Sequence, residues 1–297
     1  DVYKRQVLNQ RRILQRRVMK ASDFIYHKPD NVAEALRYLE DYDGEARVLA
    51  GGQSLAPMLN MRLWRPAALI DINGISELSR IAVHGNGVCI GALVRHSEVE
   101  DSELIAKRLP SLAAMVRYVG DRQVRNRGTI GGSLVQGDPT GEMPLACLVL
   151  GAEISVTGPT GTRGIAMPDF YAGAYAARIE ADELLTEIRF TEHPPHFVFH
   201  ELCRRHNDFA VLSVAVTGAV SDDGTWRDIR IGLGGDHETP VLAADSMARV
   251  EGSRLSDTEI AVAGKAVVSA IEPPSDVRAS AEYRTYLVQQ YVTRALK

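Results

Sequence analysis

Apolar and polar positions follow two kinds of pattern along this chain, one typical of strands and one typical of helices. Short apolar runs typical of strands alternate with longer segments in which apolar residues recur at helical spacing. Strands are predicted at residues 24–26, 48–50, 68–72, 81–83, 88–90, 152–156, 182–190, 211–220 and 228–233. Helices are predicted at residues 32–39, 55–63, 97–104, 111–119, 144–150, 240–250, 257–270 and 279–295. This mixture of short strands and intervening helices predicts an α+β protein.

Turn signals divide the pattern into three units that follow an N-terminal arm. Asn73-Gly74 separates a first unit, residues 19–75, from a second, residues 76–192, and Pro194-Pro195 precedes a third, residues 193–297. Residues 1–18 carry six basic residues against one acid, Asp1, and show no core pattern. We expect Met19 to be the natural start and the arm to be non-native or disordered. A basic targeting arm is the alternative interpretation.

Composition and charge narrow the function classes. The chain has 297 residues, of which 45% are hydrophobic and 24% charged, with a net charge of −4. These values are typical of a globular protein and give no basic field for nucleic acid. No apolar run approaches the ~20 residues of a transmembrane helix, so we do not expect an integral membrane protein. Three scattered cysteines, Cys89, Cys147 and Cys203, exclude a four-cysteine iron–sulfur site within this chain.

Two glycine-pair segments carry the candidate chemistry. The first glycine loop, residues 49–55, follows a predicted strand and precedes a predicted helix. It comprises Leu49, Ala50, Gly51, Gly52, Gln53, Ser54 and Leu55. The second glycine segment, residues 120–134, is also predicted to be a loop, and it contains three arginines and then Thr129, Ile130, Gly131, Gly132 and Ser133. Glycine lets the backbone adopt positive φ and approach a ligand, and successive N–H groups form an anion site.

Neither segment fits the spacing of a Rossmann or Walker motif, which argues against NAD on a Rossmann fold and against an ATPase. On its own, a Gly-Gly-polar loop is more often an ordinary tight turn. Two such segments on one chain suggest one long anionic ligand that is held at two places, as a dinucleotide would be. The dipole at the start of the helix after Leu55 would favour a phosphate. For Arg122, Arg125 and Arg127, contact with phosphate, pairing with carboxylates and contact with a partner chain all stay open.

The two segments, in this order, resemble the FAD-binding medium subunit of the molybdenum hydroxylases, the xanthine dehydrogenase and aerobic carbon monoxide dehydrogenase group. The likeness runs from about Met19 to the C-terminus. It includes Leu69-Ile70-Asp71-Ile72, Ile90-Gly91-Ala92, Asp182-Glu183-Leu184-Leu185, Arg204-Arg205, Asp208-Phe209-Ala210 and Leu233-Gly234-Gly235. The resemblance implies a two-part FAD-binding domain of the p-cresol methylhydroxylase and vanillyl-alcohol oxidase type, followed by a C-terminal α+β flavoprotein domain.

The resemblance also implies the cofactor and its site. FAD would be held non-covalently, because no histidine lies in a motif for covalent attachment. Residues 49–55 and 129–133 would bind the pyrophosphate and adenosine region. Asp138 and Glu142 would lie near the ribityl chain and ring, and Leu184 would contact the isoalloxazine, although a plain strand residue is an equal interpretation of Leu184. Gln136-Gly137 departs from the family pattern beside these residues.

A second departure lies at Phe199-His200-Glu201, where relatives often have an aromatic residue and a lysine near the flavin. If a cation tunes the flavin potential, His200 or one of the neighbouring arginines must supply it. His193, His196, His200 and His206 cluster around Cys203, but their spacing is not that of ordinary metal ligands and we expect no metal. His96 is interpreted as a helix-start residue rather than a catalyst.

Three function classes follow. The resemblance implies an FAD-binding electron-transfer subunit of a cytoplasmic complex, with the inner face of the membrane as an alternative location. Partner subunits would hold the molybdopterin (large) and two [2Fe–2S] clusters (small), in a dimer of heterotrimers. FAD would pass electrons to NAD, a quinone or oxygen. The alternatives are a free-standing FAD-dependent oxidoreductase of the same fold, for which no substrate acid or base is evident, and a non-redox binding module. Carbon monoxide, purines, aldehydes and N-heterocycles are all served by similar medium subunits.

Overall fold

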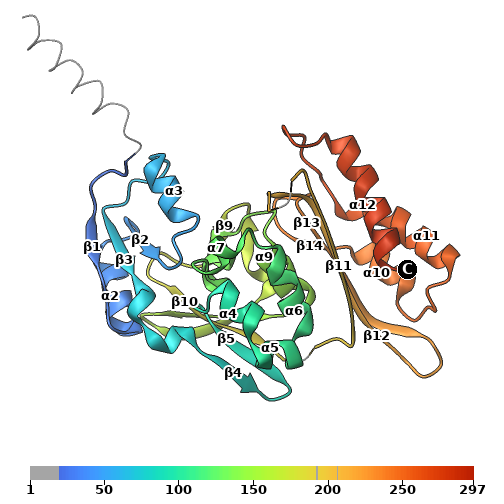
Figure 1. Cartoon of the computed structure of the whole chain (residues 1–297), viewed down its shortest axis with the longest axis horizontal. Helices are drawn as coiled ribbons and strands as arrows, with labels where there is room; N and C mark the ends of the chain where they lie inside the picture. The colour runs from blue at the N-terminus through green and yellow to red at the C-terminus, as the bar shows by residue number, and fades with distance from the viewer. Residues whose placement is uncertain (1–19, 192, 206) are drawn as a thin grey trace, which may run out of the picture.

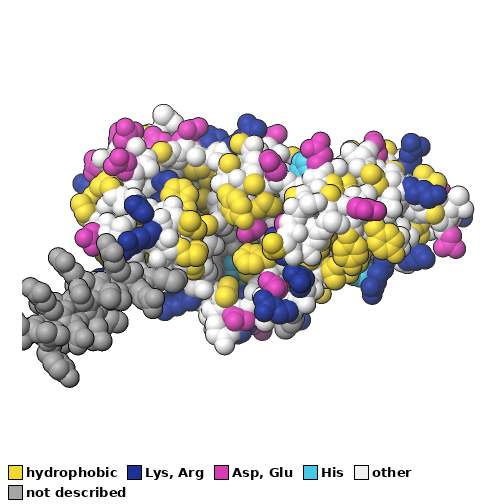
Figure 2. All heavy atoms as spheres, turned by 90° about the horizontal axis from the view of Figure 1, so that it is seen from above, with side chains coloured by type: hydrophobic (Ala, Val, Ile, Leu, Met, Phe, Trp, Pro, Cys, Tyr) yellow, Lys and Arg dark blue, Asp and Glu magenta, His cyan; other side chains and the backbone are white. Residues whose placement is uncertain are grey.

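The computed structural model describes residues 20–191, 193–205 and 207–297 (Figure 1). The expectation for residues 1–18 and the part of the histidine cluster at His206 therefore lie outside the described residues. Among the described residues, no helix has both the length and the apolar character that crossing a membrane requires. Figure 2 shows basic and acidic side chains interspersed over the face seen from above, in keeping with the small net charge of −4.

A small parallel sheet begins the described chain. Its strands β1 (Ile25–His27), β3 (Ala68–Asp71) and β2 (Ala46–Leu49) lie in that order, accompanied by helices α2 (Val32–Asp41) and α3 (Leu55–Asn60). Helix α2 forms where the sequence provides a cap, because Asn31 Oδ1 accepts the Glu34 N–H at 2.9 Å. Since β2 and β3 are parallel, both end at the same edge of the sheet, where the first glycine loop begins.

A five-stranded antiparallel sheet forms the middle of the molecule, with the order β4 (Ile81–His84), β5 (Gly87–Gly91), β10 (Leu184–Phe190), β6 (Glu153–Gly158) and β7 (Gly161–Ala166). The helices that follow β5 are α4 (His96–Asp101), α5 (Glu103–Arg108), α6 (Pro110–Met115), α7 (Arg122–Arg125), α8 (Ile130–Gln136) and α9 (Glu142–Val149). A two-stranded ribbon, β8 (Tyr171–Gly173) and β9 (Ala176–Ala177), lies beside α8. The sheet and these helices share one apolar core.

The C-terminal part is an antiparallel sheet of β11 (His196–Cys203), β12 (Ala210–Val220), β13 (Trp226–Gly234) and β14 (Val241–Leu242). Helices α10 (Ala244–Val250), α11 (Asp257–Ala266) and α12 (Ala281–Ala295) cover its outer face (Figure 1). Helix α9 packs on the inner face, where a Cβ at Gly232 would lie 2.3 Å from Val149 Cγ1. Glycine on β13 thus lets a helix of the middle unit approach this sheet closely. The chain is mixed helix and sheet, with the α+β architecture that the pattern predicted.

The structure differs from the sequence prediction at several elements. The helix predicted at residues 55–63 ends at Asn60, and that predicted at residues 97–104 is divided into α4 and α5 at Ser102, which caps α5. Strand β11 was not predicted. The predicted loop at the second glycine pair was wrong, since Gly131 and Gly132 lie in the first turn of α8. Thr129 caps that helix and overcomes the low helix propensity of glycine.

Candidate functional site

The first glycine loop is notable for backbone amides without partners. The N–H groups of residues 51–55 donate to no acceptor within the described part of the chain. Gly52 has a φ of +71°, which glycine adopts without strain, and its carbonyl accepts the Ala56 N–H at 3.0 Å as α3 begins. Gln53 Nε2 donates to Gly51 O at 3.2 Å. Five successive unpaired amides between a strand and a helix are suited to an anion.

The second glycine segment is built differently. Thr129 Oγ1 accepts the Gly132 N–H at 3.1 Å, and the Gly131 N–H donates to Ala92 O at 3.0 Å. The Ile130 and Ser133 amides are also bonded, to Val94 O and Thr129 O. A Cβ at Gly131 would lie 2.7 Å from Ala92 O, so glycine is required there for packing within the protein. The amides of residues 130–133 therefore stabilise the start of α8 in this structure.

The two glycine-rich segments touch. A Cβ at Gly51 would lie 2.4 Å from Arg127 O and 2.8 Å from Gly128 Cα. Only glycine at position 51 permits this approach. The structure thus brings together the two stretches that the sequence analysis singled out, although they are far apart in the chain.

Two residues absent from the predicted site, Asn73 and Arg95, connect these segments. Asn73 Nδ2 donates to Ala50 O at 2.9 Å and to Leu49 O at 3.3 Å. Arg95 Nη2 donates to Asn73 Oδ1 at 2.5 Å, and Arg95 Nη1 donates to Arg127 O. The sequence signals were faint: Asn73 stands in an ordinary turn dipeptide, and Arg95 directly precedes a helix.

Two of the three arginines of the second glycine segment are engaged with carboxylates. Arg122 pairs with Glu100 at 2.8 Å and with Asp101 at 2.5 Å, and Arg125 Nε pairs with Glu100 at 2.9 Å. Arg125 also donates to the carbonyls of residues 119 and 120. The structure therefore favours pairing within the protein for Arg122 and Arg125.

His96 lies near this segment, at the start of α4, and is 2% exposed. Its Nε2 lies 3.0 Å from Ser133 Oγ, and burial lowers its pKa to about 4.

The remaining predicted site residues occupy separate places. Asp138 organises a turn, because its Oδ1 accepts the Thr140 N–H at 2.9 Å and its Oδ2 accepts the Tyr175 hydroxyl at 3.2 Å. Glu142 begins α9, where burial and then the nearby Glu201 carboxyl raise its pKa to about 8. Leu184 is 4% exposed, its side chain lies in the apolar core, and it pairs in register with Thr157 of β6.

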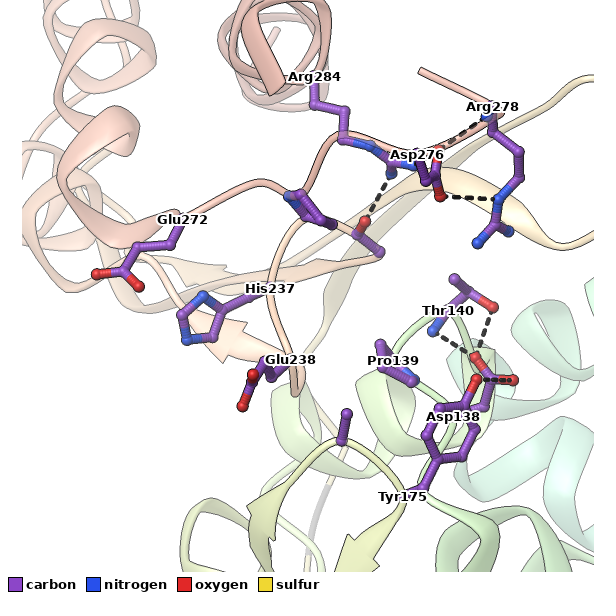
Figure 3. A pocket seen from close by; sticks show the side chains of 13 residues that line it. Asp138, Pro139, Thr140, Tyr175, His237, Glu238, Glu272, Asp276, Arg278 and Arg284 are labelled. Carbon is purple, nitrogen blue, oxygen red and sulfur yellow. Dashed lines mark hydrogen bonds and ion pairs between the residues drawn. The ribbon is translucent and has the colours of Figure 1, made fainter. Parts of the chain in front are cut away.

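A cavity of about 550 Å³ opens between the middle and C-terminal parts of the chain (Figure 3). Asp138, Thr140 and Tyr175 line one side of it. His237, Asp276 and Arg284 line the other. The Arg284 side chain is 1% exposed and is fixed by Gly235 O at 2.7 Å, by Val211 O and by Asp276 Oδ1 at 3.0 Å. The cavity has the size and the mixed polar lining of a small-molecule site.

The histidine cluster of the sequence is dispersed in the structure. His193 Nε2 lies 2.9 Å from Ser111 Oγ, His196 packs against Trp226, and His200 meets the ring of Tyr291. In the described ranges, no three His, Cys, Asp or Glu residues are grouped so that they could hold a metal ion.

Comparison with known proteins agrees with these features. Residues 19–191 match the family model described as the FAD binding domain in molybdopterin dehydrogenase, and residues 197–297 match that of the CO dehydrogenase flavoprotein C-terminal domain. The chain is 35% identical to the glyceraldehyde dehydrogenase medium chain of Sulfolobus acidocaldarius, over 94% of this chain and 99% of that one. It is 34% identical to the nicotine 6-hydroxylase medium subunit of Paenarthrobacter nicotinovorans, over 94% and 98%.

A solved structure extends the comparison to the fold. The chain aligns with a chain of carbon monoxide dehydrogenase from Hydrogenophaga pseudoflava, in a form that lacks the Mo-pyranopterin moiety of the molybdenum cofactor. The TM-score is 0.90 at 35% identity, over 93% of this chain and 96% of that one. The described part of the chain therefore has the FAD-binding and C-terminal flavoprotein domains of these proteins. The unpaired amides of residues 51–55, with Gly51 set closely against Arg127, fit a bound dinucleotide pyrophosphate.

Proposed function

This chain belongs to the FAD-binding medium-subunit family of the molybdenum hydroxylases, and on that premise we propose that it carries electrons through FAD from partner [2Fe–2S] clusters to an external acceptor. Its relatives are subunits of dehydrogenase and hydroxylase complexes, so the chain is an FAD-binding oxidoreductase subunit. Bound FAD supplies the redox chemistry, while the chain binds and orients it.

The observation that carries the proposal is the run of unpaired amides at residues 51–55. We assign the pyrophosphate to these amides, with Gln53 and Ser54 as side-chain donors. Residues 129–133 would lie beside the amides of the first glycine loop, and within this group Gly132 and Ser133 are partly exposed. From there the cofactor would extend toward Asp138 and Glu142, with the backbone at Leu184 against the ring.

The cavity beside Asp138 is our candidate for the acceptor site. Its volume of about 550 Å³ suits a small molecule, and it borders the turn that we assign to the cofactor's ring end. NAD, a quinone and oxygen are the acceptors that we consider. His237 and Arg278 supply donors on its C-terminal side, and Tyr175 supplies a hydroxyl on the other.

The donor would be a partner subunit. We propose a small subunit that carries two [2Fe–2S] clusters and a large subunit that binds molybdopterin and hydroxylates the substrate, assembled as a dimer of heterotrimers. Several relatives are named as medium chains of multi-subunit enzymes, which supports this arrangement. Cys89 and Cys147 are buried singly in this chain, and Cys203 lies apart from both, so the clusters are assigned to the partner.

The test uses the FAD-loaded chain alone and then with its partners. Dithionite should bleach the flavin absorbance in the isolated chain, whereas a hydroxylase substrate should not. Adding the molybdenum and iron–sulfur subunits should make the same flavin reducible by substrate. Rapid bleaching by substrate in the isolated chain would instead identify a free-standing flavoenzyme. Failure to retain FAD would contradict the cofactor assignment itself.

A further inference from the structure

We propose that Arg95, acting with Asn73, positions the first glycine loop to receive the cofactor's diphosphate. The inference rests on the proposed function of that loop and assigns a role to two residues that lie outside it. Arg95 directly precedes α4, and Asn73 follows β3, so neither belongs to a glycine-rich segment.

Arg95 and Asn73 form a hydrogen-bonded bridge between the two glycine-rich segments. On one side, Asn73 Nδ2 holds Ala50 O at 2.9 Å and Leu49 O at 3.3 Å, which fixes the backbone just before the unpaired amides. On the other side, Arg95 Nη1 holds Arg127 O, the atom against which Gly51 packs. The Arg95–Asn73 hydrogen bond of 2.5 Å joins the two halves.

The planar guanidinium is what allows one side chain to reach both acceptors. Its separate N–H groups point in fixed directions, whereas a lysine ammonium is a compact charge that would satisfy one acceptor at a time. Asn73 is equally specific, because it accepts from Arg95 with its oxygen, while its nitrogen donates to the loop and to Asp71 Oδ1 at 2.5 Å. The bridge therefore fails if either residue loses one of its groups.

The charge at this place also fits an anionic ligand. Neither Arg95 nor Arg127 forms an ion pair with a carboxylate of the described residues. The charged groups that influence Arg95 are Arg127, Glu98 and Asp71, and burial is the largest influence on its pKa, which it lowers. The Arg95 guanidinium, which contacts Arg127 O beside Gly51, is thus a cation without a carboxylate ion pair near the five unpaired amides, where phosphate oxygens would be stabilised.

The role is one of pre-organisation. Five amides bind a diphosphate well only if their directions are fixed before the ligand arrives, since ordering the loop on binding costs free energy. Without the bridge, no hydrogen-bonded link among the described residues would connect residues 49–52 with the second glycine segment, and the packing at Gly51 would remain. The loop would then still exist, and its affinity for the diphosphate would fall.

The experiment measures FAD and ADP dissociation constants for the full-length chain and four variants. Arg95→Lys keeps the positive charge and removes the guanidinium that contacts both Asn73 and Arg127 O. Asn73→Ala removes the amide that links Arg95 to the first glycine loop, and the double variant combines both changes. Arg108→Lys is the matched control, because Arg108 also ties two backbone carbonyls, those of Gly85 and Asn86, at the β4–β5 hairpin. ADP is included because it contains the diphosphate without the flavin.

Each single variant should raise the dissociation constants of FAD and ADP about tenfold, because the loss of one hydrogen bond to a charged group has about this effect. The double variant should be no weaker than the singles, because the two residues act as one unit. Arg108→Lys should stay within about twofold of the wild type. If Arg95→Lys fails to fold, Asn73→Leu gives the same test, since it keeps the size of the side chain, removes both the acceptor for Arg95 and the donor to the loop, and adds no charge beside Asp71.

Unchanged FAD and ADP affinity in folded bridge variants would overturn the proposal. Additive losses in the double variant would also overturn it, by showing two independent contributions. A wild-type chain that binds neither ligand would instead contradict the proposed cofactor site, so the two failures are distinguishable. A fall in melting temperature with intact ligand affinity would assign Arg95 a purely structural role.

Discussion

The carboxyl group of Glu201 on β11 adds to the burial that raises the pKa of Glu142 on α9, and neither group has an ion-pair partner among the described residues. Glu201 pairs in register with Ser213, which pairs with Gly234, and α9 packs on this row through Leu145. Cys203 Sγ donates to Glu201 Oε1 at 2.9 Å, and Asp138 and Asp208 are further acids near this cluster. The joint between the middle and C-terminal parts thus contains an acidic pair.

The first prediction concerns stability against pH. Glu142 has a folded-state pKa of about 8 against an ordinary value of 4.5, so the folded chain binds more protons than the unfolded chain between these values. The contribution of Glu142 to the free energy of unfolding should therefore be greatest below pH 4.5 and should fall as pH rises toward 8. Glu142→Gln should remove this fall, which amounts to on the order of a few kcal/mol in the free energy of unfolding between the two pKa values. Urea unfolding at a series of pH values measures it.

Replacing Glu201 tests the same pair from the other side. Glu201→Lys places a cation beside Glu142 and should lower the pKa of Glu142, moving the fall in stability to lower pH and making it smaller. Glu201→Gln removes only the like charge and should give a smaller shift, because burial is the larger influence on Glu142. If both variants keep the wild-type pH profile, the two carboxyls do not interact.

Much of the architecture could be predicted from periodicity, and the exceptions have physical causes. Strand β11 contains His196 and His200 and charged Glu201, so its alternation was read as a histidine cluster. Its two faces meet different layers: Phe197 and Phe199 pack on the middle core and Val198 and Leu202 on the C-terminal core. A strand covered on both sides lacks a clear polar face.

The candidate site was predictable in part. Glycine pairs mark backbone that must approach something closely, and at Gly51 and Gly131 the structure shows close neighbours. The sequence does not reveal that these neighbours are Arg127 O and Ala92, because close approach of protein and of ligand require the same residue. The roles of Asn73 and Arg95 depend on contacts between residues far apart in sequence, which no local pattern contains.

A further prediction concerns Gly51. A Cβ there would overlap Arg127 O, so Gly51→Ala should separate the two glycine-rich segments, lower the melting temperature and abolish FAD retention. Gly173→Ala is the control, since its Cβ would meet only Glu238 Oε2, at 3.6 Å. Flavin content after purification and differential scanning fluorimetry measure both effects. A Gly51→Ala chain with full flavin content would show that contact between the segments is not needed for binding.

Amide hydrogen exchange with and without FAD tests the central claim most directly. In the free chain, the amides of residues 51–55 have no partners among the described residues, whereas that of Gly131 is bonded and buried. Our account predicts that FAD slows exchange at residues 51–55 strongly and leaves Gly131 nearly unchanged, because only the former are available to the pyrophosphate. Unchanged exchange at residues 51–55 in the FAD-bound chain would contradict the assignment of the first glycine loop as the site of the pyrophosphate.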